Sequence, residues 1–274
     1  MCARFGLHLE QLDVKTIFLH GDLEEEIYML QPKGFEQLKM KNLVCRLNKS
    51  LFGLKQAPRY WYKRFDSFIP SLGYNRLISD PCTYFKMLGK DDYIILLLYV
   101  DDMLVAGPNK DRIKELKAQL AKEFEMKDLG PANKILGMQI HRDKNNRKIW
   151  VSQKNYFNKI LRRFNMQDFK PISTSFPMNF KLSSMGAVSR YIANPGREHW
   201  SNVKRVLRYV KGTSNVALCY GGSHFICSVY VDSNFAGDLD KRKSTTGFVF
   251  TLANGAISWV LKLQSVVALS TTEA

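Results

Sequence analysis

The sequence predicts an α+β fold: a first region rich in strands, a middle region with basic helices, and a final region of strands. Three observations support this prediction. Short apolar runs punctuated by Gly and Pro fill residues 1–108, helical periodicity follows, and apolar runs of strand length return after residue 226. The 274 residues are 45% hydrophobic and 24% charged, which is ordinary globular composition and enough for one large or two modest domains.

In the first region, two apolar runs predict a hairpin. Tyr93–Val100 is β-branched and aromatic, and Met103–Ala106 continues until Gly107–Pro108. We therefore expect two strands joined by a tight turn that places Asp101 and Asp102 at its tip.

The rest of the chain predicts helices that alternate with strands. Residues 110–125 place Ile113, Leu116, Leu120 and Phe124 on one helical face. A hairpin of Ile135–His141 and Lys148–Gln153 follows, and then a helix with Tyr156, Ile160, Leu161 and Phe164 facing inward. Residues 165–184 are predicted to be a linker. The later predictions are a basic helix, Glu198–Lys211, with Val203, Val206, Leu207 and Val210 on its apolar side, and three strands, Ile226–Val231, Gly247–Leu252 and Ala256–Leu261.

The positive charge is concentrated in one stretch. The net charge is +16, and Asn109–Thr213 holds 23 Lys and Arg against 8 Asp and Glu. A polyanion such as nucleic acid is the simplest partner for this stretch. A solvated helical face that only aids solubility is the alternative.

Cysteine, histidine and hydropathy patterns exclude other classes. The five cysteines form no C-x-x-C pair, and the five histidines show no metal-binding spacing, so we expect reduced thiols and no zinc site. The sequence shows no signal peptide and no transmembrane segment, so an intracellular protein without membrane attachment is expected.

The Asp101–Asp102 pair suggests metal chemistry. Joining nucleotides uses two metal ions about 3.5–4 Å apart, and Mg²⁺ prefers carboxylate oxygens. Adjacent carboxylates repel each other, so a cation would stabilise this turn. Asp is also common in exposed turns, so the pair alone leaves both interpretations open. Asp13, after an apolar stretch, is either a third ligand or an ordinary cap.

Three segments in order along the chain form recognisable motifs: Gln11–Met29, Ser50–Tyr62 and Tyr99–Met103. They resemble the three catalytic motifs of the reverse transcriptases in the Pol polyproteins of copia-type LTR retrotransposons, and the resemblance covers almost the whole chain. Leu136–Asp143 resembles their primer-gripping hairpin. The segments that continue the resemblance are Asn194–Trp200, Arg208–Thr213, Val231–Asp238 and Leu269–Ala274.

The resemblance implies a right-hand polymerase palm with partial fingers and a basic helical thumb and connection, followed by an incomplete RNase H-like sheet. It implies that Asp13, Asp101 and Asp102 are catalytic and hold two Mg²⁺ ions, or Mn²⁺. The implied partners are an RNA template, a DNA primer and dNTP, and the oligomeric state stays open. The family's proteins act in the cytoplasm, within virus-like particles, or in the nucleus.

Further site residues follow from the resemblance. Those implied to bind nucleotide or template are Val14, Phe18, Gly53, Lys55 and Gln56, and those implied in the primer grip are Gly137, Met138 and Gln139. Phe18 would lie under the incoming sugar and exclude a 2′-hydroxyl, with an ordinary core phenylalanine as the alternative. Retroviral relatives carry Gln where this chain has Phe52, so that contact does not transfer directly.

The resemblance also divides the chain. It implies a reverse transcriptase part (1–165), a linker and basic connection helix (166–213) and the start of an RNase H-like domain (214–274). Asp232 and Glu273 resemble the first two RNase H carboxylates, although a strand-end cap and a helix-start charge are the alternatives.

Relative to the family, residues are missing before Met1, between Ser184 and Met185, and after Ala274. We therefore expect no RNase H activity and weak or no DNA synthesis. The leading hypothesis is a reverse transcriptase fragment. The alternative is a non-catalytic nucleic-acid-binding remnant of a decayed element.

Overall fold

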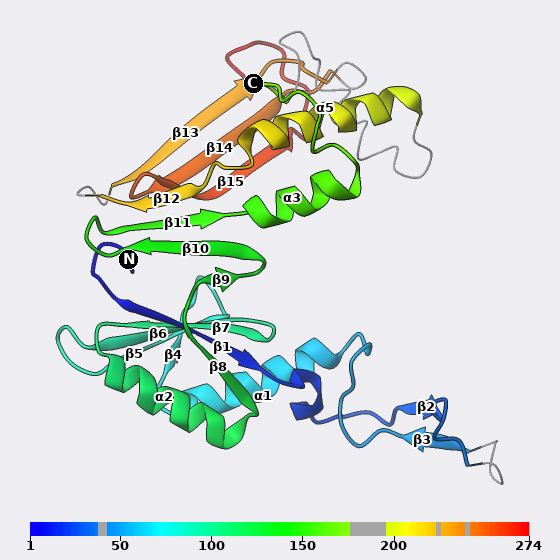
Figure 1. The fold of residues 1–274 in the computed structure, drawn as a ribbon, viewed down its shortest axis with the longest axis vertical. Coiled ribbons are helices and arrows are strands. Elements are labelled where there is room, and N and C mark those ends of the chain that lie inside the picture. Colours follow the sequence, from blue (N-terminus) through cyan, green and yellow to red (C-terminus); the bar gives the residue numbers. More distant parts are fainter. Residues whose placement is uncertain (38–42, 176–195, 223–225, 239–241, 274) are drawn as a thin grey trace. The chain divides into compact units, whose positions relative to one another are not determined.

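The computed structural model describes residues 1–37, 43–175, 196–222, 226–238 and 242–273 (Figure 1). The chain forms two compact units, Met1–Ala132 and Asn133–Ala274, and each is described by itself. The domain boundaries predicted after residues 165 and 213 stay predictions.

The first unit is built on a six-stranded antiparallel sheet with the order β4-β5-β6-β7-β1-β8. Its strands are β1 (His8–Val14), β4 (Asn75–Arg76), β5 (Thr83–Met87), β6 (Tyr93–Tyr99), β7 (Asp102–Gly107) and β8 (Met126–Pro131). The predicted hairpin is confirmed as β6 and β7, although Asp102 already belongs to β7. In this strand order, β1 pairs with β7 on one side and with β8 on the other.

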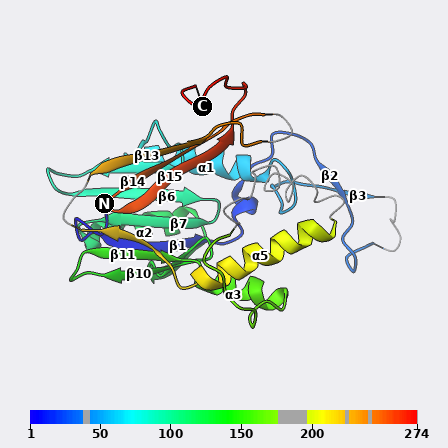
Figure 2. The same ribbon diagram turned by 90° about the horizontal axis from the view of Figure 1, so that it is seen from above.

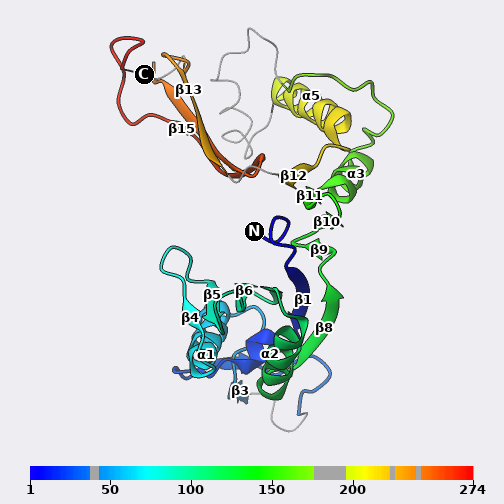
Figure 3. The same cartoon turned by 90° about the vertical axis from the view of Figure 1, so that its left-hand side faces the viewer.

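Helices α1 (Ala57–Ser71) and α2 (Lys110–Glu123) cover one face of this sheet (Figure 3). Along β6, Ile94, Leu96 and Leu98 are buried, while Leu97 and Tyr99 are exposed. This alternation is the period of a strand with one covered face. The helices fill the core from their own side. The helical side chains of this core are Trp61, Phe65, Ile69, Ile113, Leu116 and Leu120.

The prediction for residues 110–125 is confirmed, because all four predicted apolar positions of α2 are buried. Asn109 caps the helix, since its side chain accepts a hydrogen bond from the backbone N–H of Asp111 at 2.9 Å. The 3-10 turn η1 (Ile17–His20) follows β1, and β2 (Tyr28–Leu30) pairs with β3 (Val44–Arg46) in a separate two-stranded sheet.

The second unit begins with a four-stranded sheet in the order β12-β11-β10-β9. Its strands are β9 (Lys134–Ile135), β10 (Met138–Asp143), β11 (Lys148–Ser152) and β12 (Leu218–Gly221). The predicted hairpin is confirmed as β10 and β11. Asp143 holds its turn, since its carboxylate accepts hydrogen bonds from the backbone and side chain of Asn146.

Helices α3 (Lys154–Arg163) and α5 (Arg197–Thr213) run beside each other (Figure 2). They share a small core of Leu161, Met166 and Leu207. The predicted inward face of α3 is wrong at Tyr156 and Phe164, which are 54% and 44% exposed. The core that α3 shares with α5 is too small to cover a full apolar stripe. The predicted linker lies outside the described residues from residue 176 onward.

The three final strands are confirmed as β13 (Cys227–Asn234), β14 (Thr245–Leu252) and β15 (Gly255–Leu263), in that order in one antiparallel sheet. Val229, Tyr230 and Val231 are all exposed. Because consecutive side chains of a strand point to opposite faces, β13 is open on both sides. The Tyr220 hydroxyl donates a hydrogen bond to the Ala256 carbonyl at 2.7 Å and ties β12 to β15.

Candidate active site at the ends of β1, β6 and β7

Two of the three predicted catalytic aspartates lie directly opposite each other. In the antiparallel pairing of β1 with β7, Asp13 is the cross-strand partner of Asp102, and both are half-buried. Side chains at such positions have Cβ atoms about 4.5–5.5 Å apart, and like charges there are destabilising. The two carboxylates therefore form a place where a bound cation would stabilise the fold.

The third aspartate lies in the turn beside this pair. Tyr99 pairs with Asp102, so Val100 and Asp101 form a two-residue connection between β6 and β7. The Asp101 carbonyl accepts a hydrogen bond from the backbone N–H of Val14 at 3.1 Å. This bond joins the turn to the residue after Asp13, so all three aspartates belong to one small region.

The turn contains a strained residue. Val100 has a φ of 56°, which is unusual for a β-branched side chain. The indole N–H of Trp61 on α1 donates a hydrogen bond to the Val100 carbonyl at 2.8 Å, and Trp61 is fully buried. Backbone strain of this kind persists where surrounding contacts hold it and is common at functional sites. Sequence reasoning placed Trp61 within a motif but did not predict this contact.

Gln11 is a site residue that sequence reasoning missed. Its side-chain amide donates a hydrogen bond to Oδ1 of Asp102 at 3.0 Å, and its side chain is buried. The available signal was its spacing, because Gln11 precedes Asp13 by two residues on a strand and so shares its face.

A pocket of about 520 Å³ lies next to the aspartates. It brings together three predicted residues, Val14, Phe18 and Asp101. The remaining lining residues are Thr16, Ile17, Leu19, Leu51, Phe52 and Val100. The rings of Phe18 and Phe52 lie 5.7 Å apart between centroids, so they form an aromatic wall. Phe18 is thus a pocket residue as well as a side chain packed on the core.

Three other predicted nucleotide- or template-binding residues do not line this pocket. Gly53 has a φ of 98°, a left-handed conformation that favours glycine, in the loop before α1. Gln56 donates a hydrogen bond to Glu25 at 3.5 Å, and Lys55 lies in the same loop. Their assignments stay predictions.

The predicted primer-grip residues begin β10. Leu136 and Gly137 both have positive φ, and Ile135 pairs with Met138, so a tight two-residue turn joins β9 to β10. Met138 also lines a separate, mostly apolar pocket of about 480 Å³ in the second unit. Neither the turn nor the pocket position of Met138 tests the primer-grip role, which stays a prediction.

The structure shows one strand pairing for Asp232 and one hydrogen bond for Glu273, the two predicted RNase H residues. Asp232 is exposed on β13, where it pairs with Gly247. Glu273 accepts a hydrogen bond from the backbone N–H of Leu269 at 2.8 Å. That contact is the behaviour of a capping carboxylate, so the catalytic assignment stays a prediction.

A different acidic run is already neutralised by basic side chains. Asp22 forms ion pairs with Lys49 and Arg64, and Glu24 forms one with Lys63. The hydrogen bond from Lys49 lowers the pKa of Asp22, and that from Lys63 lowers the pKa of Glu24. These carboxylates therefore have cationic partners, whereas Asp102 has an uncharged amide.

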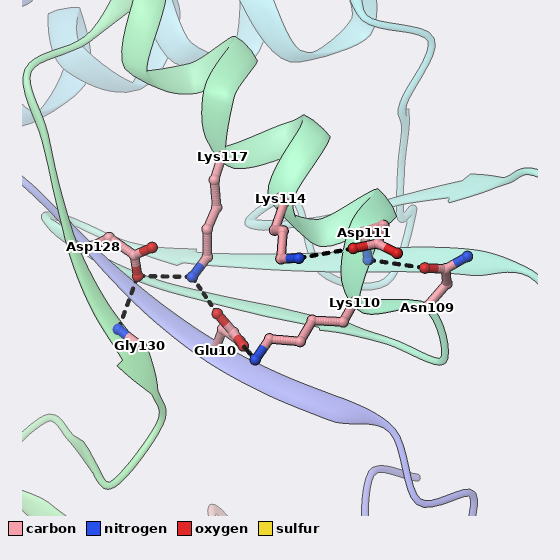
Figure 4. A network of polar contacts seen from close by, with 8 residues as sticks. All are labelled: Glu10, Asn109, Lys110, Asp111, Lys114, Lys117, Asp128 and Gly130. Carbon is pink, nitrogen blue, oxygen red and sulfur yellow. Dashed lines mark hydrogen bonds and ion pairs between the residues drawn. The ribbon is translucent and has the colours of Figure 1, made fainter.

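The face of β1 opposite Asp13 carries a buried ion network (Figure 4). Lys117 on α2 forms ion pairs with Glu10 on β1 and with Asp128 on β8, the latter at 2.7 Å. The pairing of β1 with β8 shifts register between Gln11 and Leu12. Lys117 thus ties both strands to one helix at this irregular point, three residues before Asp13.

A metal site of three or more acidic, histidine or cysteine side chains is not preformed in the described ranges. The donor set nevertheless fits a hard cation, because Asp13 and Asp102 are opposed carboxylates and Asp101 is adjacent. The predicted residues therefore share a region but do not form a closed cage.

The comparisons with known proteins identify the family of the chain. The family described as "Reverse transcriptase (RNA-dependent DNA polymerase)" matches residues 1–179. The chain belongs to the reverse transcriptase family. Family members normally use a divalent metal ion, and the matched residues include the whole first unit and the start of the second.

Individual relatives confirm the copia-type resemblance. A retrovirus-related Pol polyprotein from transposon TNT 1-94 of Nicotiana tabacum is 50% identical over the whole chain. That from transposon RE2 of Arabidopsis thaliana is 32% identical over 97% of the chain. The chain spans only 24% and 20% of these two polyproteins. It is also 30% identical to a putative transposon Ty5-1 protein of Saccharomyces cerevisiae, over 96% of each.

The alignment with the tobacco relative runs over 313 positions, 39 more than this chain contains. The alignment therefore contains positions of the relative that have no counterpart in this chain. The predicted junction, between Ser184 and Met185, lies outside the described residues and stays a prediction. Among the described helices, none is long and apolar enough to cross a bilayer.

Proposed function

We propose that this chain carries the polymerase palm of a copia-type reverse transcriptase. It would join deoxynucleotides to a primer 3′-hydroxyl on an RNA template. The observation that carries the proposal is the register of β1 and β7, which sets Asp13 opposite Asp102, with Asp101 in the adjacent turn and lining the pocket. The exposed face of β6 and the exposed basic side chains of α3 and α5 support nucleic acid as the partner.

Two divalent ions held by Asp13, Asp101 and Asp102 would activate the 3′-hydroxyl and balance the charge of the triphosphate. The opposed carboxylates support this assignment, and Lys127 on β8 is the cross-strand partner of Asp13 on its other side. The chain's own groups do the positioning. Trp61 and Val14 fix the turn that carries Asp101, through hydrogen bonds to the Val100 and Asp101 carbonyls.

The pocket would receive the incoming deoxynucleotide. Phe18 and Phe52 supply an apolar wall on which a sugar or base can pack. A ring under the incoming sugar would leave no room for a 2′-hydroxyl. Discrimination against ribonucleotides would therefore reside mainly in Phe18.

We also propose family roles for the later parts of the chain. The hairpin of β10 and β11 is proposed as the primer grip, and α3 and α5 as thumb and connection. Strands β13–β15 are proposed as the start of an RNase H-like domain, with Asp232 on β13 as its first carboxylate.

Primer extension on an RNA template with Mg²⁺ or Mn²⁺ tests the proposal. We expect extension, weak in absolute rate, that Asp101→Asn abolishes. Asp91→Asn removes the same charge in an exposed turn outside the site and should leave extension unchanged. Extension that survives Asp101→Asn would contradict the proposal.

Binding without turnover is the second candidate. The observation that favours it is the set of exposed basic side chains on α3 and α5. Salt-sensitive binding of a primer–template duplex, with no extension under any metal condition, would select this candidate.

A further inference from the structure

Two carboxylates near β1, those of Glu10 and Asp102, have different kinds of side-chain partner. Glu10 is buried on the helix side and is paired with the ammonium group of Lys117 (Figure 4). Asp102 is half-buried, and the side-chain amide of Gln11 donates a hydrogen bond to it at 3.0 Å. An ammonium group cancels the charge of a carboxylate, whereas an amide orients the carboxylate and leaves its charge in place.

Gln11 is itself a constrained donor. Its side chain is only 7% exposed, on a strand that is paired on both sides. A buried amide is retained where it has a hydrogen-bond partner, because an unsatisfied one is costly. The same strand carries Asp13 two residues later, so Gln11, Asp13 and Asp102 share one face of the sheet.

The hydrogen bond uses one oxygen of Asp102. Gln11 donates to Oδ1, so Oδ2 stays available for a further electropositive partner. A carboxylate held through one oxygen cannot rotate freely. Outer partners that orient a metal ligand in this way are a general feature of metal sites.

We infer that Gln11 is a positioning residue that orients Asp102 for divalent-cation binding while leaving its charge uncancelled. This inference rests on the proposed function, because it takes Asp102 to be a metal ligand. Gln11 itself contributes no metal ligand and touches no substrate; it acts through Asp102.

Direct metal binding tests the inference without any need for polymerase turnover. Mn²⁺ titration of the full chain, followed by the electron paramagnetic resonance signal of free Mn²⁺, gives the affinity. Gln11→Met has similar size but no donor. We expect it to weaken Mn²⁺ binding by about tenfold, the lower end of the usual effect of losing such a partner.

A double-substitution cycle separates positioning from a general structural effect. If Gln11 acts through Asp102, Gln11→Met should cause little further loss in the Asp102→Asn background. The luminescence lifetime of bound Tb³⁺ gives a spectroscopic check, because loss of the Asp102 oxygen should add coordinated water in Gln11→Met. Gln264→Met is the matched control, since Gln264 donates a comparable hydrogen bond to Thr246 in another sheet.

The outcomes are distinct. If Asp102→Asn weakens Mn²⁺ binding and Gln11→Met does not, the inference is overturned and the proposed function stands. If Asp13→Asn and Asp102→Asn both leave binding unchanged, the proposed function fails and the inference fails with it.

A measurement on the unsubstituted chain covers the case in which Gln11→Met does not fold. In protein labelled with ¹⁵N-glutamine, saturating Mg²⁺ should shift the side-chain amide resonance of Gln11 and not that of Gln264. An unshifted Gln11 amide, in a chain whose Mg²⁺ binding depends on Asp102, would overturn the inference.

Discussion

At the scale of single residues, the site depends on contacts that support an unfavourable turn. Val100 would not adopt a positive φ without compensation. Its carbonyl bonds to Trp61, and the next carbonyl, of Asp101, bonds to Val14. Helix α1 thus contributes to the turn between β6 and β7 through one indole nitrogen. The Tyr99–Met103 and Ser50–Tyr62 segments are separated in sequence but meet at this hydrogen bond.

Replacing Trp61 with Phe should therefore destabilise the first unit. The change removes the indole donor and leaves the Val100 carbonyl without its partner, which costs about 1–3 kcal/mol, with a further loss from the smaller ring. Urea unfolding followed by circular dichroism measures the difference. Trp200→Phe, at an exposed position of α5, should stay within about 0.5 kcal/mol. Equal effects of the two substitutions would contradict a special role for the Trp61 hydrogen bond.

At the scale of elements, β1 carries different chemistry on its two faces. Gln11 and Asp13 lie on the face of the sheet away from the helices. Glu10, Leu12 and Val14 lie on the face that the helices cover. Lys117 anchors the helix side where β1 and β8 change register. The strand that presents Asp13 is therefore tied to α2 by charge as well as by apolar packing.

Lys117→Met should destabilise the first unit strongly. The substitution leaves the buried Glu10 carboxylate with only the exposed ammonium group of Lys110, at 4.0 Å, and breaking a buried pair costs about 3–5 kcal/mol. The double variant Glu10→Leu with Lys117→Met removes both charges and should recover much of the loss. Lys114→Met breaks only the exposed pair with Asp111, so it should cost less than about 1 kcal/mol. Urea unfolding of the unsubstituted chain and the three variants measures these differences in unfolding free energy.

The same network predicts a pH effect. Burial acts to raise the pKa of Asp128, but hydrogen bonds from Lys117 and the Gly130 backbone outweigh it, and the pKa lies below its ordinary value of 3.8. A lowered folded-state pKa gives stability that is present above the ordinary value and lost as the pH falls through the folded value. Because the Asp128 side chain is 56% exposed, solvent screens the effect.

Asp128→Asn should accordingly flatten the acid limb of stability. The unfolding free energy measured in urea from about pH 6 down to about pH 2 should fall less steeply in the variant than in the unsubstituted chain. The two curves should differ most at the upper end of this range. An identical acid limb in both proteins would show that the Lys117 bridge to Asp128 contributes nothing.

The elements differ in how far the sequence could predict them. Short apolar runs bounded by turn residues predicted the β6–β7 hairpin and the three final strands, and helical periodicity predicted the apolar face of α2. Tyr156 and Phe164 were predicted inward and are exposed, since the period alone does not tell how wide a partner surface will be.

The site shows the same limit. Phe18 and Asp101 could be assigned from their motifs, and the structure places both at one pocket. Strand register, which sets Asp13 opposite Asp102, depends on pairing between segments about ninety residues apart. The spacing of Gln11 and Asp13 places both on one face, but the contact of Gln11 with Asp102 depends on that pairing. The contact of Trp61 depends on how α1 packs beside the β6–β7 turn, which no local pattern could predict.

At the scale of the whole molecule, charge is divided between the two compact units. The opposed aspartates lie in the first unit. Much of the excess positive charge belongs to the basic stretch from Asn109 to Thr213, and Arg162 and Arg163 near the end of α3 are exposed. A polymerase needs both charge signs, acidic groups for metal ions and basic groups for phosphates.

Nucleic-acid binding should therefore depend steeply on salt, and the dependence should report on single basic residues. Each phosphate contact releases counterions, so loss of one contact reduces the slope of log affinity against log salt by about one. Arg163→Gln should lower the slope by that amount for a primer–template duplex, measured by fluorescence anisotropy at several salt concentrations. Lys90→Gln removes the same charge from an exposed turn outside the basic stretch and should leave the slope unchanged. Equal loss in both variants would mean that net charge, and not a surface on α3, attracts the duplex.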